Sequence, residues 1–272
     1  MKSLRNSRIK TLTLRLAGSA LVALVSLPAS GAEILLHEAR YEISLESLNV
    51  EGFPLSAGGK MAVRLSRDCQ KWETLQEMQF SIGMEEGQPI DIHMMTRMLE
   101  GLDGSRMEFS GWSSQDGKHR TNLKGSATMN RDGFGGSASF RQPEETDWDL
   151  PPPTQLPMAS LKNFLDALSS GQNAPQSITF EVLGISEVTG IAPGKAVNLK
   201  KLETGDPALV SGRSWLVDRA LFFEQIAQNE PFLIETLQIH DNGVVSKFWH
   251  DYKTMVLSAE LVALTEIPAP DC

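Results

Sequence analysis

The sequence is poor in the residues that most often bind metals. It has two cysteines and five histidines among 272 residues, and the histidines form no His-x-x-x-His pair and no Cys/His cluster. Transition-metal sites need such ligands close together. The sequence also lacks a Gly-x-Ser-x-Gly nucleophile motif, a P-loop and a Gly-x-Gly-x-x-Gly fingerprint after a strand. We therefore expect no metal, no other cofactor and no enzymatic activity.

Long apolar runs are also missing, and the longest is a short stretch near the N-terminus, Leu16 to Leu27. A membrane-spanning helix needs about 20 apolar residues, so we do not expect an integral membrane protein. Small residues follow this stretch, and basic residues precede it without an acid: Lys2, Arg5, Arg8, Lys10 and Arg15. This order predicts a signal peptide over residues 1–32, cleaved after Ala32, and a periplasmic mature protein.

Positive charge is scarce in the predicted mature chain. The full sequence carries a net charge of −9, and removal of residues 1–32 takes away five basic residues and no acidic ones, leaving −14. Nucleic acid and anionic lipid headgroups repel such a protein. We therefore expect no nucleic-acid partner.

The two cysteines, Cys69 and Cys272, both follow the predicted signal peptide. An isolated pair in an exported protein is most simply a disulfide, because thiols oxidise outside the cytoplasm. The alternative is two buried reduced thiols. A disulfide would connect the last residue to the first third of the chain, and such bonds typically stabilise by about 2–4 kcal/mol.

Alternating residues predict a mainly β protein. Tyr41, Ile43 and Leu45 alternate with polar residues, and the segment from Met255 to Leu264 has apolar residues at both parities, which indicates burial on both faces. Glycine-containing turn signals separate the short segments, as expected for hairpins: Gly58-Gly59, Gly101 to Gly104, Asp116-Gly117, Asp132-Gly133, Gly135-Gly136 and Asp241-Asn242-Gly243. The predicted fold is a single large curved antiparallel sheet, either a β-spiral or a half-open barrel, wrapped around an amphipathic helix.

The helix is predicted over Pro157 to Ser170, with Pro157 in its first turn and Gly171 as its left-handed cap. A shorter helix is predicted over Ala220 to Gln228. The apolar stripe of the first helix should pack on the concave face of the sheet, where it could also contact an apolar ligand; its residues are Met158, Leu161, Phe164, Leu165 and Leu168.

A proline-rich run over residues 150–157 divides the chain near its middle. Consecutive prolines are stiff and cannot donate to a sheet ladder, so we interpret this run as a crossover rather than a recognition motif. It joins the halves 33–149 and 158–272, which we expect to share one sheet in a single domain over residues 33–272.

The sequence contains only one weak candidate for a catalytic cluster. Asp241, His250 and Asp251 place two acids and one base close in sequence, beside the predicted hairpin turn Asp241-Asn242-Gly243. This cluster would support an enzyme acting on envelope polymers only if its side chains met in a concave pocket.

The order and spacing of many short motifs resemble the EipB family of exported alphaproteobacterial cell-envelope integrity proteins, over essentially the whole mature chain. The motifs are His37-x-Ala39-x-Tyr41-x-Ile43-x-Leu45, Gly59-x-Met61, Asp68-Cys69-x-x-Trp72, Lys124-Gly125-x-Ala127, Leu156-Pro157 before a helix ending near Gly171, Glu235-x5-Asp241-Asn242-Gly243-Val244-x6-Asp251-Tyr252, and Leu261-Val262-x-Leu264-x-x-Ile267-Pro268-x-Pro270-x-Cys272. Two positions depart from the family pattern. Val182-Leu183-Gly184 replaces Phe-Asp-Gly, and Asp251-Tyr252-Lys253 replaces Asp-Tyr-Gly.

The resemblance implies a periplasmic β-spiral with a Cys69–Cys272 disulfide, a fold similar to that of bacterial lipoprotein carriers, and a role in envelope integrity. It also implies a protein partner, because family members are linked to periplasmic repeat proteins. Our first hypothesis is a non-enzymatic scaffold or adaptor. The alternative is a carrier or sensor for an acyl chain or lipidated peptide, which requires a large apolar cavity.

Overall fold

The computed structural model describes residues 32–49, 56–172, 178–197, 202–223 and 230–272. Residues Gly31–Cys272 form one compact unit. The predicted signal peptide lies outside the described residues, except for its last residue, Ala32.

The first half of this unit is a run of long strands. They are β1 (His37–Leu48), β2 (Ser56–Arg67), β3 (Lys71–Gly83), β4 (Ile90–Gly101), β5 (Arg106–Gln115), β6 (Lys118–Met129), β7 (Gly136–Gln142) and β8 (Thr146–Leu150).

The second half contains the helix and shorter strands. Its elements are β9 (Thr154–Gln155), α1 (Pro157–Ser169), β10 (Ile178–Glu181), β11 (Gly184–Pro193), the 3-10 helix η2 (Pro207–Val210), β12 (Ser214–Phe222), β13 (Leu233–His240), β14 (Val245–Asp251) and β15 (Met255–Glu266).

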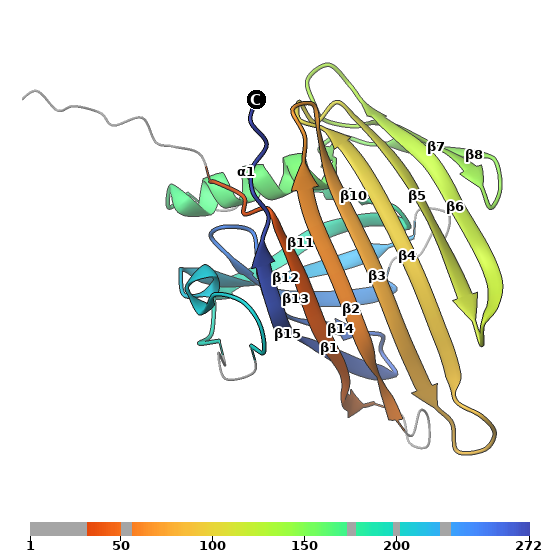
Figure 1. The fold of residues 1–272 in the computed structure, drawn as a ribbon. Coiled ribbons are helices and arrows are strands. Elements are labelled where there is room, and N and C mark those ends of the chain that lie inside the picture. Colours follow the sequence, from red (N-terminus) through yellow and green to blue (C-terminus); the bar gives the residue numbers. More distant parts are fainter. Residues whose placement is uncertain (1–31, 50–55, 173–177, 198–201, 224–229) are drawn as a thin grey trace, which may run out of the picture. The chain divides into compact units, whose positions relative to one another are not determined.

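All strands of the described residues belong to one 15-stranded sheet with the order β8-β7-β6-β5-β4-β3-β2-β1-β15-β14-β13-β12-β11-β10-β9. The first and last strands, β1 and β15, are antiparallel neighbours in the middle of the sheet. The pairs are antiparallel except for β9 and β10, which are parallel. The predicted mainly β fold with a single large curved sheet is confirmed (Figure 1).

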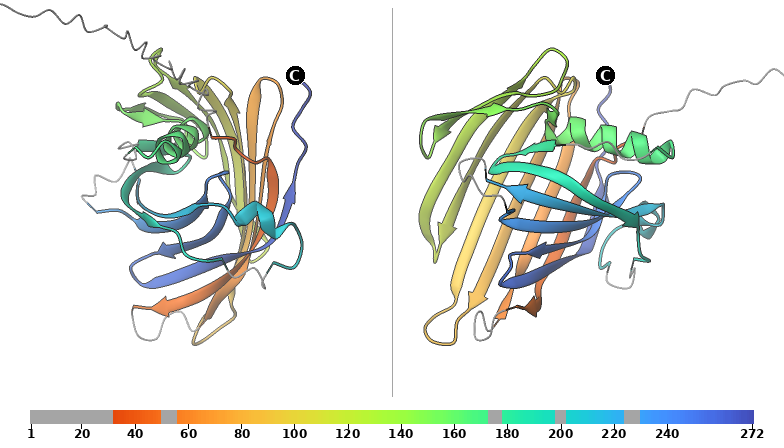
Figure 2. Two further views of the ribbon diagram at one scale, coloured as in Figure 1. Left: turned by 90° about the vertical axis from the view of Figure 1, so that its left-hand side faces the viewer. Right: turned by 180° about the vertical axis from the view of Figure 1, so that it is seen from behind.

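The sheet curls so that the second half lies behind the first (Figure 1), and α1 runs across one end of the space between them (Figure 2). The inner end of the sheet reaches the opposite wall. Phe180 of β10 is fully buried and packs against Phe109 of β5, with ring centroids 5.9 Å apart. Such an overlap of one end of the sheet with the wall of the other half is the geometry of a spiral.

Side-chain alternation explains which face is buried. In β1, His37, Ala39, Tyr41 and Ile43 are buried while the residues between them are exposed. In β15 side chains on both faces of the strand are buried, as predicted. Leu257 is buried on one face, and Ser258 and Leu264 are buried on the other.

Helix α1 begins with Pro157 and ends in a Schellman motif, as its sequence predicts. Gly171 has φ +72°, its N–H donates to the carbonyl of Leu168, and the N–H of Gln172 donates to that of Ala167.

Two local predictions were wrong. Gly58-Gly59 is not a turn but lies inside β2, where a Cβ on Gly59 would lie 2.0 Å from the carbonyl oxygen of Gln79, so these glycines allow close strand approach. The helix predicted from Ala220 is also wrong where it can be observed. Ala220 to Phe222 finish strand β12, paired with β13, and residues 224–229 lie outside the described residues.

The proline-rich run links the two edges of the sheet, since β8 ends at Leu150 and α1 begins at Pro157. Contrary to the expectation of a plain connector, Thr154 and Gln155 within it form β9 and pair with β10. The three prolines themselves, 151–153, lie between the two edge strands, where no ladder hydrogen bond is required of them.

Candidate functional site

A cavity of about 230 Å³ lies beneath α1, between the two walls of the curled sheet. The first half contributes Thr74 and Met98. The helix and the second half contribute mostly apolar side chains and a few polar ones: Pro157, Met158, Ser160, Leu161, Phe164, Thr179, Glu181, Val188, Val217, Arg219, Leu237, Ile239 and Val245. We call this space the α1 cavity.

Three residues of the predicted apolar face, Met158, Leu161 and Phe164, line the α1 cavity. The other two do not line it. Leu165 is fully buried in the adjoining core, and Leu168 borders a separate surface hollow with Trp215. The apolar stripe therefore packs α1 against the sheet, and its residues in the first two turns of the helix also line one side of the α1 cavity.

The N-terminus of α1 is held by a carboxylate from β4. The N-cap residue Leu156 offers no side-chain acceptor, and instead the backbone N–H groups of Met158 and Ala159 donate to Glu100 at 2.8 and 2.9 Å. Burial raises the pKa of Glu100 to about 7, although the two N–H donors favour its charged form. Glu100 thus joins the helix to the first half of the sheet.

Charged side chains cross the inner face of the second half from strand to strand. Arg219 of β12 donates through Nη1 to Glu181 of β10 at 3.0 Å, and through Nε and Nη2 to Glu235 of β13, with the Nε contact at 2.8 Å. His250 of β14 lies 2.8 Å from Glu235 through Nε2. We call Glu181, Arg219, Glu235 and His250 the charge ladder.

The ladder is a partly desolvated ion-pair network. Burial alone would raise the pKa of Glu235, but Arg219 and His250 bring it to about 2. Burial alone would lower the pKa of Arg219, whereas Glu235 and Glu181 raise it above its ordinary value. Arg219 and Glu235 therefore stabilise each other's charges, and Arg219 and Glu181 form a polar edge of the mostly apolar α1 cavity.

Of this ladder, the hypothetical catalytic cluster contains only His250, although Glu235 also begins one of the family motifs. His250 belongs to the ladder, but Asp241 lies at the other end of the β13–β14 hairpin, 3.9 Å from Arg213, and Asp251 accepts a hydrogen bond from the N–H of Lys253. The three residues of the hypothetical catalytic cluster therefore do not converge. Within the described ranges, no group of three or more His, Cys, Asp or Glu residues could hold a metal ion.

Both departures from the family pattern lie in turns. Leu183 is 60% exposed in the tight turn between β10 and β11, beside the buried Val182. Lys253 follows β14 and has φ 68°, a conformation that glycine adopts more easily. The glycine that the family pattern has at this position is therefore explained by the backbone conformation of the turn.

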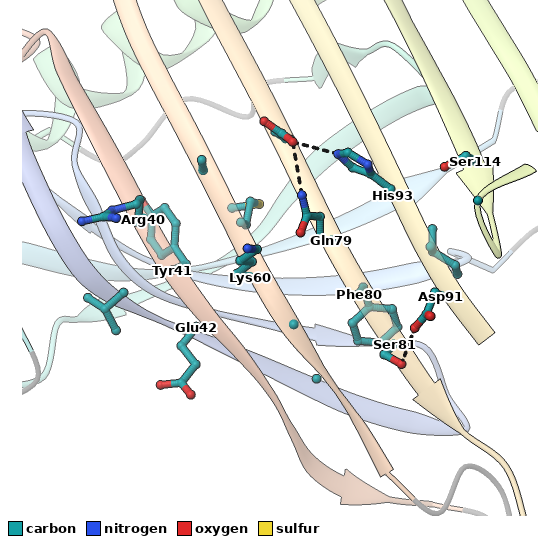
Figure 3. Close-up of a pocket in the computed structure, with 18 of the residues that line it drawn as sticks. Arg40, Tyr41, Glu42, Lys60, Gln79, Phe80, Ser81, Asp91, His93 and Ser114 are labelled. Carbon is teal, nitrogen blue, oxygen red and sulfur yellow. Dashed lines mark hydrogen bonds and ion pairs between the residues drawn. The ribbon is translucent and has the colours of Figure 1, made fainter. Parts of the chain in front are cut away.

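A much larger hollow, of about 980 Å³, opens on the outer face of β1–β5 (Figure 3). We call it the outer groove. Its lining mixes apolar surface with charged groups of both signs. It consists of Arg40, Tyr41, Glu42, Gly58, Gly59, Lys60, Met61, Ala62, Glu77, Gln79, Phe80, Ser81, Asp91, Ile92, His93, Ser114, Gly117 and, from β15 and the segment beside it, Val262 and Glu203.

Hydrogen bonds fix part of the groove surface. Glu77 lies 2.8 Å from Nε2 of His93 and accepts a bond from Gln79, and Ser81 donates to Asp91 at 2.7 Å (Figure 3). Period-two alternation indicates which of these side chains point outward, but it does not predict a hollow, because the curvature of a face depends on how the strands twist in the folded sheet.

Cys69 and Cys272 form a disulfide with Cα atoms 5.6 Å apart. Cys69 lies between β2 and β3, and Cys272 ends the chain beyond β15. The bond therefore links the β2–β3 turn to the segment after β15, on either side of β1 in the middle of the sheet. Among the described helices, none has the length and apolar character needed to cross a membrane.

The comparisons with known proteins agree with this architecture. The family model described as EipB-like matches residues 28–268. A solved structure of a beta-barrel-like protein, from a domain of unknown function in Brucella abortus, is similar with a TM-score of 0.75 at 20% identity, covering 87% of this chain and 100% of that one. No curated protein matches the chain. The chain therefore belongs to the EipB-like family.

Proposed function

We propose that this protein is a non-enzymatic periplasmic scaffold or adaptor that supports cell-envelope integrity by binding a protein partner through the outer groove. The observation that carries the proposal is the size and character of this groove, an open hollow of about 980 Å³ in which apolar surface is mixed with charged groups of both signs. Non-obligate protein interfaces mix apolar surface with a polar, charged rim in this way, whereas small-molecule pockets are lined mostly by hydrophobic side chains with only a few polar groups.

The predicted signal peptide and the disulfide support an oxidising, exported location. The charge pattern supports a partner with complementary charges, since Arg40 and Lys60 lie among several carboxylates in the groove. A periplasmic repeat protein, as the family resemblance implies, is the partner class that we favour.

A charge reversal in the groove tests this proposal. In a deletion strain, the wild-type gene should restore resistance to envelope-damaging detergent, and Glu42→Lys should fail to do so at equal protein level. Glu38→Lys is the matched control, because Glu38 is on the same face of β1 but does not line the groove. Equal rescue by both variants would contradict a role for the groove.

The alternative function is a carrier or sensor for an apolar ligand, and the α1 cavity favours it. This cavity has the predicted helix residues in its wall, but its volume of about 230 Å³ is below the roughly 300–1,000 Å³ of ordinary ligand pockets. It suits a short chain rather than a whole lipid, so we rank this function second.

A further inference from the structure

The charge ladder leaves hydrogen-bonding capacity at the edge of the α1 cavity. A guanidinium has five N–H donors, and among the described residues three of those of Arg219 are bonded, to Glu181 and Glu235. Glu181 accepts from Arg219 and Ser186 through the same oxygen, Oε1, and its Oε2 has no partner in the described part of the chain. Both Arg219 and Glu181 line the cavity.

The two ladder residues that line the cavity therefore present a donor and an acceptor side by side, bridged by the bond of 3.0 Å between Nη1 of Arg219 and Oε1 of Glu181. Two hydroxyl groups, those of Ser160 and Thr179, also line the cavity and lie 2.7 Å from each other. The remaining wall is mostly apolar. An occupant must therefore be apolar along its length and polar at one end.

The ladder's charge determines which polar end can be accommodated. Two carboxylates, Glu181 and Glu235, already surround the single guanidinium of Arg219. Arg219 already bonds two carboxylates and His250 already bonds Glu235, so neither is left to neutralise an anionic head. An ammonium head has no acceptor, so it would leave the spare N–H groups of Arg219 unpaired beside a second cation. A neutral head that both donates and accepts satisfies Glu181 and Arg219 together.

We propose that the α1 cavity binds a short apolar chain ending in an uncharged head with both a donor and an acceptor, such as a primary amide. The inference rests on the ligand-binding alternative above and names the class of ligand. A volume of about 230 Å³ corresponds to roughly eight water-sized groups at about 30 Å³ each, so an eight-carbon probe is appropriate.

Three probes that differ only in the head test the proposal: octanamide, octanoate and octylammonium, titrated into the oxidised mature protein by calorimetry at pH 8. We expect octanamide to bind at least tenfold more tightly than either ion. Octanoate or octylammonium binding as tightly as the amide would overturn the inference while leaving ligand binding in place. Binding of none of the three would overturn both.

Two variants locate the binding. Glu181→Gln removes one negative charge and should narrow the preference for octanamide over octanoate at least threefold, whereas Glu187→Gln, at a β11 position outside the cavity lining, should not. Leu161→Trp should fill the cavity and abolish octanamide binding, with folding verified by circular dichroism. An unchanged preference in Glu181→Gln, or unchanged octanamide binding in folded Leu161→Trp, would contradict the assignment of the site.

Discussion

At the residue scale, the most consequential side chains were not predictable from their neighbours in sequence. Arg219 and Glu181 are 38 residues apart, and Arg219 and Glu235 are 16 apart. They meet because strand register places Arg219 opposite Glu235 and Glu235 opposite His250. A single sequence does not specify that register, so the search for nearby residues selected Asp241, His250 and Asp251 instead.

The ladder should contribute to stability in a pH-dependent way. The pKa of Glu235 is about 2 in the fold, below its ordinary 4.5, so its contribution is present above pH 4.5 and is lost as the pH falls through 2. Glu235→Gln should lower the free energy of unfolding by about 3 kcal/mol at pH 7 and by less at pH 3, measured by urea denaturation. An equal loss at both pH values would contradict this account.

The backbone conformation of Lys253 predicts that glycine at this position stabilises the protein. Its φ of 68° is unfavourable for a side-chain-bearing residue, and glycine should relieve this cost, so Lys253→Gly should raise the free energy of unfolding by about 1 kcal/mol. Lys253→Ala is the control, because it removes the exposed ion pair with Glu230 and keeps the backbone cost. If alanine stabilised as much as glycine, the backbone explanation would be wrong.

At the element scale, the sequence predicted α1 well because proline, apolar spacing and the capping glycine all agree. It failed where two signals conflict. Gly58-Gly59 has the composition of a turn but lies between two neighbouring strands, and Ala220 to Phe222 has helical spacing but pairs with β13. Tertiary pairing overrides local preference at both positions.

The attachment of α1 through Glu100 should also depend on pH. Since the pKa of Glu100 is raised from 4.5 to about 7, its stabilising contribution is complete below pH 4.5 and is lost as the pH rises through 7. The side chain of Glu100→Gln does not titrate. Relative to this variant, the free energy of unfolding of the wild type should fall by up to about 3 kcal/mol between pH 4.5 and 8.

Urea unfolding at pH 5 and pH 8 measures this difference directly. The exposed Glu108 on the next strand provides the control, because Glu108→Gln should leave the pH dependence of the wild type unchanged. Parallel pH profiles for the wild type and Glu100→Gln would contradict the account of this buried carboxylate.

At the scale of the whole molecule, alternation and turn residues sufficed to predict a mainly β fold with one curved sheet. They did not predict that the edge strands β8 and β9 follow each other in the chain while β1 and β15 pair in the centre. That order depends on how the sheet curls, and hence on long-range packing such as that of Phe180 against Phe109.

The disulfide should stabilise the whole domain, since it joins two residues that are 203 positions apart. Cys69→Ser and Cys272→Ser should each lower the free energy of unfolding by about 2–4 kcal/mol, and the double variant should be no worse than either single one. Additive losses in urea denaturation would indicate that the two residues act independently.

The central claim is that the outer groove binds a protein partner in the periplasm. The most direct measurement is photo-crosslinking in the living cell, with a photoreactive residue in place of Ser114 in the groove or, as the control, of Glu38 outside it. We predict a covalent adduct with one protein at position 114 that is absent at position 38. Identical adducts at both positions, or none at 114 from a fully exported protein, would contradict the claim.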